Sequence, residues 1–219
     1  MLPYFLYNAI TYMTAIALFS LIILILSIVV HEVAHGYSAY LFGDPTAKNQ
    51  GRLTFNPIKH IDPFGSIILP FFMSLIPGGI ILGWAKPVPI NPYNFTRRKL
   101  GEFVTAFAGP LSNMIIAAVF IVMIRFAGQL GMSAAFVQLS FAIVLINSVL
   151  ALFNLIPIPP LDGYRILSVF LPGDTVEKFE RFAQRFGMLL VLFFVFFLWN
   201  PIFLMLLSLL EVLTGVRIS

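Results

Sequence analysis

Two histidines and a glutamate close a long apolar run in the stretch SIVVHEVAHGYSAY, residues 27–40. His31, Glu32 and His35 form the pattern H-E-x-x-H, and residues four positions apart lie on one face of a helix. Both imidazoles can therefore bind one cation, while the glutamate reaches water beside it. An ionisable side chain at membrane depth costs about 2.5–3.5 kcal/mol, which favours a chemical role over a chance pentapeptide. Zinc is the metal that this set suits.

A catalytic zinc site commonly has three protein ligands and one open position, so a third ligand is needed. The chain has no cysteine, which leaves an acidic residue or His60, the only other histidine. The best candidate is Asp162 in the stretch NLIPIPPLDG, residues 154–163. The prolines favour extended backbone, and Gly163 closes the turn that presents the carboxylate. The alternative is a proline-rich exit loop with an ordinary turn aspartate.

The two motifs together resemble the site-2 protease family of intramembrane zinc metalloproteases, whose signatures are H-E-x-x-H and N-x-x-P-x-P-x-x-D-G. The resemblance covers about residues 31–165. Three further stretches, GRLTFNPIKHIDPFG, GWAKPVPINP and FAGPLSN, are similar to the short bacterial and archaeal branch of the family. Two spaced motifs in one chain are far more specific than either motif alone.

The resemblance implies a set of site residues. One zinc ion would be held by His31, His35 and Asp162, with Glu32 as the catalytic base. Asn154, and as a second candidate Asn113, would line the site or hold the substrate backbone, and either amide could donate to the oxyanion that develops during hydrolysis. Since the third ligand position falls to Asp162, we expect His60 to lie at the surface or at a cavity rim. Better-known members have a span ahead of the H-E-x-x-H helix or a PDZ or CBS module, and we expect neither here.

The composition is that of an integral membrane protein, with 60% hydrophobic residues, 10% charged residues and a mean hydropathy of +0.99. Without cysteine, the chain has neither disulfides nor thiolate ligands. The N-terminus lacks a positively charged region and a small-residue cleavage site, so the first apolar stretch is interpreted as a retained span. We expect residues 1–219 to form a single membrane-embedded domain.

Four regions are long and apolar enough to cross the membrane as helices, for which about 20 residues suffice. They cover approximately residues 12–41, 103–127, 134–156 and 186–213. The last is interrupted at Asn200-Pro201, and we expect one long kinked helix, with a helical hairpin as the alternative. The polar segment that begins at Gly173 is predicted to be an amphipathic surface stretch leading into this span. The expected fold class is an all-α polytopic membrane protein.

A fifth apolar segment, residues 65–83, contains helix-breaking proline and glycine. If it enters the membrane and returns, the loops 42–63, 83–102 and 157–185 share one side. These loops hold eleven of the thirteen basic residues: Lys48, Arg52, Lys59, Lys86, Arg97, Arg98, Lys99, Arg165, Lys178, Arg181 and Arg185. The positive-inside bias then makes that side cytoplasmic. We therefore expect a re-entrant, short strand-like region around residues 64–95 and an active site that opens toward the cytoplasm.

The expected function is the hydrolysis of peptide bonds within or near transmembrane segments of membrane-protein substrates, with the lipid bilayer as surroundings and no nucleic acid as partner. The segment GWAKPVPINP is a candidate edge for pairing with an unwound substrate, or else packs at the membrane interface. A competing function is a transporter that relays protons or cations through the same buried ionisable cluster. An inactive scaffold is disfavoured because every expected catalytic group is present. The sequence predicts no oligomeric state.

Overall fold

The computed structural model describes residues 2–68, 71–72 and 83–217. Its long helices are α1 (Leu2–Leu41), α4 (Arg98–Arg125), α5 (Ala134–Asn154), α7 (Gly173–Phe193) and α8 (Trp199–Thr214). Four helical stretches are long and apolar enough to span a membrane: Thr11–Leu41, Arg98–Arg125, Ala134–Asn154 and Arg185–Thr214. No strand occurs among the described residues. The predicted all-α membrane fold and its four spans are confirmed.

Shorter elements join these helices. They are α2 (Thr46–Asn49), α6 (Asp162–Ser168), 3-10 turns at Pro57–His60 and Pro92–Asn94, and π-helical turns at Pro63–Ile68 and Phe194–Leu198. Helix α1 is followed by a turn that contains Gly43, whose φ of 103° is readily adopted only by glycine. Ser133 caps the start of α5, because its hydroxyl accepts a hydrogen bond from the Phe136 N–H.

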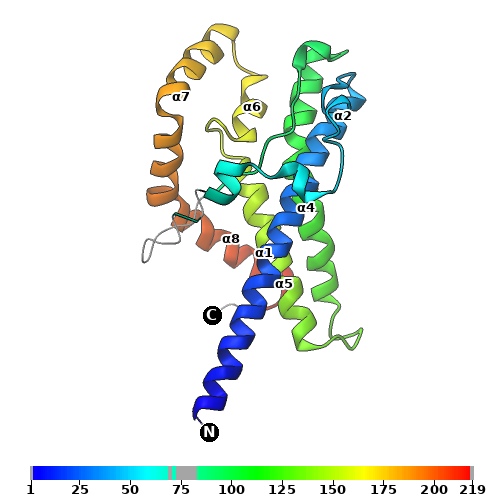
Figure 1. Cartoon of the computed structure of the whole chain (residues 1–219), viewed down its shortest axis with the longest axis vertical. Coiled ribbons are helices and arrows are strands. Elements are labelled where there is room, and N and C mark those ends of the chain that lie inside the picture. The colour runs from blue at the N-terminus through cyan, green and yellow to red at the C-terminus, as the bar shows by residue number, and fades with distance from the viewer. Residues whose placement is uncertain (1, 69–70, 73–82, 218–219) are drawn as a thin grey trace.

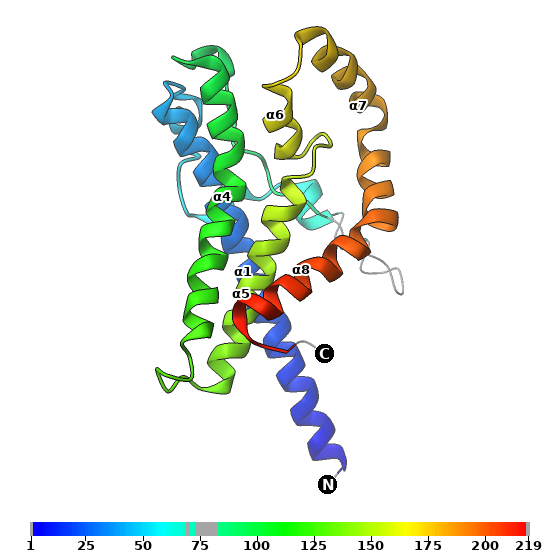
Figure 2. The ribbon, with the colours of Figure 1, turned by 180° about the vertical axis from the view of Figure 1, so that it is seen from behind.

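The last span is one bent helix. Pro201 lies in the first turn of α8 and has no N–H to donate to the preceding turn. The π-helical turn Phe194–Leu198 directly precedes it, and the chain changes direction between α7 and α8 (Figure 2). The structure therefore has the kinked helix that the sequence predicts, and not a hairpin. The amphipathic segment from Gly173 continues into the span without a break.

The helices place most basic loops at one end of the molecule. Figure 1 shows that α1 ends and α4 begins at the same end, and that α5 runs back toward it. The backbone between α1 and α4 therefore returns to the side from which it left, as expected if the fifth apolar segment enters the membrane and returns. The Trp84 N–H donates to the Gly65 carbonyl at 3.1 Å, so the two ends of the fifth apolar segment lie together. Most of that predicted re-entrant segment lies outside the described residues.

A small apolar core joins α4, α5 and α8 at the other end. Ile124, Val144, Leu206 and Leu210 are its buried members, and partly buried phenylalanines and aliphatic residues surround them. Many large apolar side chains on the long helices are exposed, as expected of helices that face lipid. The core therefore fixes the relative positions of the helices, while their outer faces remain available to the bilayer.

Candidate active site

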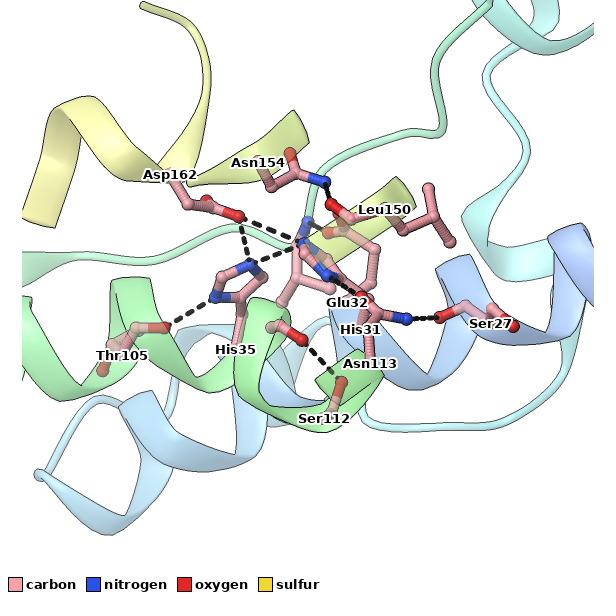
Figure 3. Close-up of polar contacts among 12 residues, drawn as sticks. Ser27, His31, Glu32, His35, Thr105, Ser112, Asn113, Leu150, Asn154 and Asp162 are labelled. Atoms are coloured by element: carbon pink, nitrogen blue, oxygen red, sulfur yellow. Dashed lines mark hydrogen bonds and ion pairs between the residues drawn. The ribbon is translucent and has the colours of Figure 1, made fainter. Parts of the chain in front are cut away.

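Three ligand-type side chains from distant parts of the chain meet beside α4 (Figure 3). His31 and His35 lie one turn apart on α1, and Asp162 is the first residue of α6. The Nε2 atoms of the two histidines are 3.0 Å apart, and each lies 3.1 Å from Oδ2 of Asp162. Both histidines are buried and the aspartate is partly buried. The three atoms are thus nearly equidistant from one another and surround a single point.

The acceptors around the two imidazoles define which ring nitrogens carry hydrogen. His31 Nδ1 donates to Oδ1 of Asn113 at 2.7 Å, and His35 Nδ1 donates to the Thr105 carbonyl at 2.6 Å. Both partners are acceptor atoms, so each neutral imidazole carries its hydrogen on Nδ1 and a lone pair on Nε2. Both lone pairs point toward the Asp162 carboxylate. Three acceptors at this separation repel one another unless a cation or a proton lies between them.

Zinc fits this donor set. Neutral imidazole nitrogen and carboxylate oxygen are both common zinc ligands, at about 2.0–2.2 Å. A tetrahedral ion at that distance holds its ligand atoms about 3.3 Å apart, close to the separations in the triangle. The hydrogen bonds from both Nδ1 atoms to fixed acceptors are the usual support for metal-binding histidines. The cluster is the only group of this kind among the described residues.

Gly109 makes room for the two imidazoles on α4. A Cβ atom at this position would lie 2.2 Å from His35 Nε2 and 2.6 Å from His31 Nε2. These distances are far inside van der Waals contact, so any side chain would displace the ligand atoms. The glycine of FAGPLSN is therefore required by the close approach of α4 to the histidine pair.

Asp162 is presented by a tightly packed turn. A Cβ atom on Gly163 would lie 2.1 Å from the Leu155 carbonyl oxygen, so α6 starts against the backbone that follows α5. The Leu161 N–H donates to the Ile158 carbonyl at 2.9 Å within the proline-rich segment. Burial disfavours the charged form of Asp162, but a proton or a cation shared with the adjacent imidazoles favours it, and the pKa of this carboxyl is then held well below its ordinary value. The group is therefore an anion at neutral pH.

Glu32 contacts the extended segment that precedes α4. Its Oε2 accepts a hydrogen bond from the Val88 N–H at 2.7 Å. Val88 lies between Pro87 and Pro89, which have no N–H, so this donor is the only one in the stretch Pro87–Pro89. This stretch has no helix or strand, and residues that precede proline, as Lys86 and Val88 do, favour extended backbone. The carboxylate next to His31 is thus held in place by the segment that the sequence marks as a candidate substrate edge.

The two asparagines have different surroundings. Asn113 is fully buried and contacts His31, and its Nδ2 donates to Asn147 at 2.9 Å and to the Ser27 carbonyl at 3.4 Å. Asn113 therefore lines the site by contacting a ligand, as one of its expected roles requires, and with both amide hydrogens used it has no donor left for a substrate. Asn154 is partly buried and donates to the Leu150 carbonyl on its own helix at 2.9 Å. Figure 3 shows Asn154 and Asp162 on the same side of the histidine pair.

The expectation for His60 is wrong in one respect. It is not part of the ligand cluster, but it is buried, with 2% of its surface exposed, and not at the surface or a rim. Its Nε2 lies 2.9 Å from the Thr54 carbonyl, and its own carbonyl accepts from the Lys86 N–H at 2.9 Å. The loop around it folds back on the extended segment, which a local sequence pattern does not reveal.

A cavity of about 430 Å³ opens beside His35. Its charged lining residues are Arg98, Glu102, Arg165 and Glu180. These come from the start of α4, from α6 and from α7, at the end of the molecule that carries most basic loops. Water can therefore reach His35 from that end without crossing the apolar faces of the helices.

The class of protein that this fold and cluster define is a membrane-embedded metallopeptidase. The profile of Peptidase family M50 matches residues 19–138 and 123–196. The chain belongs to this family, which confirms the resemblance to site-2 proteases that the two motifs indicate.

Named relatives agree with the family. YwhC of Bacillus subtilis, named as an inferred zinc metalloprotease, is 44% identical over 177 residues, which cover 78% of this chain and 77% of YwhC. Rip2 of Mycolicibacterium smegmatis, named in the same way, is 30% identical over 167 residues, which cover 76% of this chain and 62% of Rip2. Rip2 of Mycobacterium tuberculosis is 30% identical over 171 residues, covering 77% and 64%. No solved structure matches the chain.

Sequence reasoning misses three partners of the site: the Thr105 carbonyl, the Val88 N–H and the Asn147 amide. The first two are backbone groups, which no residue pattern encodes. Asn147 has a detectable signal, because it lies seven positions before Asn154 and therefore on the same face of α5. A polar residue such as Asn147 on the same face of an apolar helix as Asn154 indicates that its side chain contacts the site.

Proposed function

We propose that His31, His35 and Asp162 bind one zinc ion and that Glu32 is the general base for hydrolysis of peptide bonds within or near transmembrane segments of membrane-protein substrates. The observation that carries this proposal is the convergence of two Nε2 lone pairs and one carboxylate oxygen at 3.0–3.1 Å. The protein is an intramembrane zinc metalloprotease of the family to which it belongs. No observation favours a transporter.

Zinc, when bound, supplies Lewis acidity that lowers the pKa of water and polarises a carbonyl group. Glu32 moves the proton. Its Oε2 is held by the Val88 N–H, and its Oε1 has no recorded partner in the described part of the chain, so this oxygen can accept a proton from water. The same oxygen then delivers the proton to the amine that leaves. Asn154 becomes a donor to the substrate if it releases the Leu150 carbonyl.

The substrate must unwind before its carbonyl can be attacked, because helical carbonyls are already hydrogen-bonded. The extended segment that includes residues 84–89 is our candidate for holding the opened strand. Trp84, Lys86 and Val88 direct their N–H groups to the Gly65 carbonyl, the His60 carbonyl and Glu32. Arg52 donates to the Lys86 carbonyl at 2.7 Å and to the Pro87 carbonyl at 3.3 Å, so these two carbonyls already have a donor. The Pro89 carbonyl is therefore the acceptor that we propose for an N–H group of the substrate strand.

We place the entrance of the site on the cytoplasmic side of the membrane. The cavity beside His35 lies at the end of the molecule with eleven of the thirteen basic residues in its loops. Cysteine is absent, so single cysteines introduced at Lys48 and at Gly128 offer an unambiguous test with a membrane-impermeant thiol reagent. In intact cells the cysteine at position 48 is expected to be protected and that at position 128 to be labelled. The reverse pattern would contradict this orientation.

The function itself is tested with Glu32→Gln, which keeps the size and polarity of the side chain but cannot accept the proton. We expect zinc content to match wild type and cleavage of a membrane-embedded test substrate to fall at least about 100-fold, the lower range of a general-base contribution. Cleavage at the wild-type rate would refute the role of Glu32. Wild-type protein that purifies without zinc and cannot be loaded with it would refute the ligand set.

A further inference from the structure

Two buried amide side chains behind His31 form a chain of hydrogen bonds with a defined direction. Asn147 on α5 donates from Nδ2 to the Ile143 carbonyl at 2.9 Å. Because a carbonyl only accepts, this contact fixes the nitrogen end of the Asn147 amide. Its Oδ1 then accepts from Nδ2 of Asn113 at 2.9 Å, and Oδ1 of Asn113 lies 2.7 Å from His31 Nδ1.

The direction of this chain matters because an asparagine amide has nearly the same shape when its oxygen and nitrogen are exchanged. If Asn113 were reversed, its Nδ2 would face His31 Nδ1, which would then accept. The hydrogen of the neutral imidazole would move to Nε2, and that atom would have no lone pair for a cation. Asn113 and Asn147 both have 0% of their surface exposed, so bulk water is not an alternative partner for either amide.

We infer that Asn147 is a positioning residue for the metal centre, which fixes the orientation of the Asn113 amide and so the ring nitrogen that His31 presents to the ion. The inference rests on the proposed zinc site. Asn147 itself touches neither the ligand cluster nor a reacting group, and it acts through Asn113. The contact of Asn113 with the Ser27 carbonyl favours the same orientation, but at 3.4 Å it is the longer of its two donor contacts.

A purely structural role is the alternative. Buried amides commonly link membrane helices, and Asn147 joins α5 to α4. The two roles differ in one respect. If Asn147 only holds the helices together, its loss weakens zinc binding whatever residue stands at position 113. If it orients an amide, its loss matters only where there is an amide to orient.

A double-mutant cycle separates these roles through the zinc dissociation constant, measured on purified full-length protein by competition with a chelator of known affinity. Asn147→Leu should weaken zinc binding about 10- to 100-fold, the usual effect of losing support behind a ligand. In the Asn113→Asp background the same substitution should change affinity by less than about threefold, because both oxygens of a carboxylate accept equally well. Equal losses in both backgrounds, or no loss in the first, would overturn the inference.

Two further variants keep the test decisive if Asn147→Leu folds poorly. Asn147→Asp, when protonated, can donate to the Ile143 carbonyl and accept from Asn113, so its zinc affinity should stay within about threefold of wild type. A loss as large as that of Asn147→Leu would contradict the inference.

Ser140→Ala, which alters another buried polar residue on α5, is the matched control and should bind zinc as wild type does. Thermal unfolding of each chelated protein reports stability separately from zinc binding. A wild-type chain that binds no zinc would refute the proposed function itself, whereas wild-type and variant chains that bind equally would refute only this inference.

Discussion

The Val88 N–H donates a hydrogen bond of 2.7 Å to the Glu32 carboxylate. This contact links the proposed general base on α1 to an extended segment more than fifty residues away in the sequence. Prolines on both sides remove the neighbouring N–H groups, so the carboxylate has one fixed donor in this stretch. The segment that we propose to hold the substrate therefore also positions the group that moves the proton.

Val88→Pro should slow cleavage about 10- to 100-fold, which corresponds to the loss of a hydrogen bond to a charged group. Proline is compatible with extended backbone but has no N–H, so the change removes the donor while keeping the path of the chain. Zinc content should be unchanged. Val88→Ala, which keeps the N–H, is the control for lost packing against Gly36. Equal cleavage by the two variants would show that the N–H does not hold the base.

Gly109→Ala should weaken zinc binding at least about 100-fold, the upper end of what loss of a supporting contact costs. The added methyl group would occupy the space of both Nε2 atoms, so neither imidazole could keep its position. Gly128→Ala is the matched control, because a Cβ atom there meets nothing within 4 Å. The measurement is the zinc dissociation constant of the two purified variants. Similar constants would mean that α4 does not approach the histidines as closely as described.

Removal of the metal should destabilise the wild-type protein but not Asp162→Asn, which lacks the third ligand. An ion that binds only the folded chain stabilises it by about 4 kcal/mol when its free concentration is 1,000 times the dissociation constant. The melting temperature should therefore fall when a chelator is added to wild type and stay constant in Asp162→Asn. Asp174→Asn changes an exposed carboxylate on α7 and should behave as wild type. A chelator effect of equal size in Asp162→Asn would exclude this carboxylate as a ligand.

Asp44 should give the protein an acid-sensitive contribution to stability. Its carboxylate accepts from the Asn91 N–H at 2.7 Å, from Asn94 at 2.8 Å and from Thr46, and so joins the turn after α1 to the 3-10 turn Pro92–Asn94 ahead of α4. Burial opposes the charge, but these hydrogen bonds prevail and lower the pKa of Asp44. A carboxyl whose pKa is lower in the folded chain than in the unfolded chain stabilises the fold at pH values above its unfolded-state pKa of about 4. This stabilisation is lost as the pH falls through the folded-state pKa.

The corresponding measurement is the unfolding free energy of wild type and Asp44→Asn against pH, with chelator present so that zinc binding does not contribute. The difference should be about 1–3 kcal/mol and constant between about pH 5 and pH 8, and it should shrink below about pH 4. Asp174→Asn, at an exposed carboxylate, should show no such change. A difference that grows toward acid pH would contradict the assignment.

Local periodicity was sufficient to predict the elements that carry the ligands. The spacing of His31 and His35 is helical, and four long apolar stretches predict the spans that the structure contains. The proline-rich exit from α5 predicts a turn that presents Asp162, and the structure places this residue at the start of α6. These features depend on residues near one another in the chain.

Contacts between distant segments could not be predicted in the same way. The burial of His60 depends on the return of the loop toward Lys86, and the setting of Asn113 depends on Asn147 from another helix. The Val88 contact is made by backbone, which has the same donor at every residue except proline. Only the folded arrangement decides which of these groups meet.

The cavity beside His35 has a consequence for selectivity. Its ionised residues are two arginines and two glutamates, and one pair of opposite sign, Arg98 and Glu102, is in direct contact at 2.8 Å. Because the formal charges of the lining cancel, the cavity itself adds little to the long-range attraction that the basic loops around it exert. Within the cavity, selection among substrate helices would then depend on the free energy needed to unwind each helix, and little on the sign of the charges that flank it.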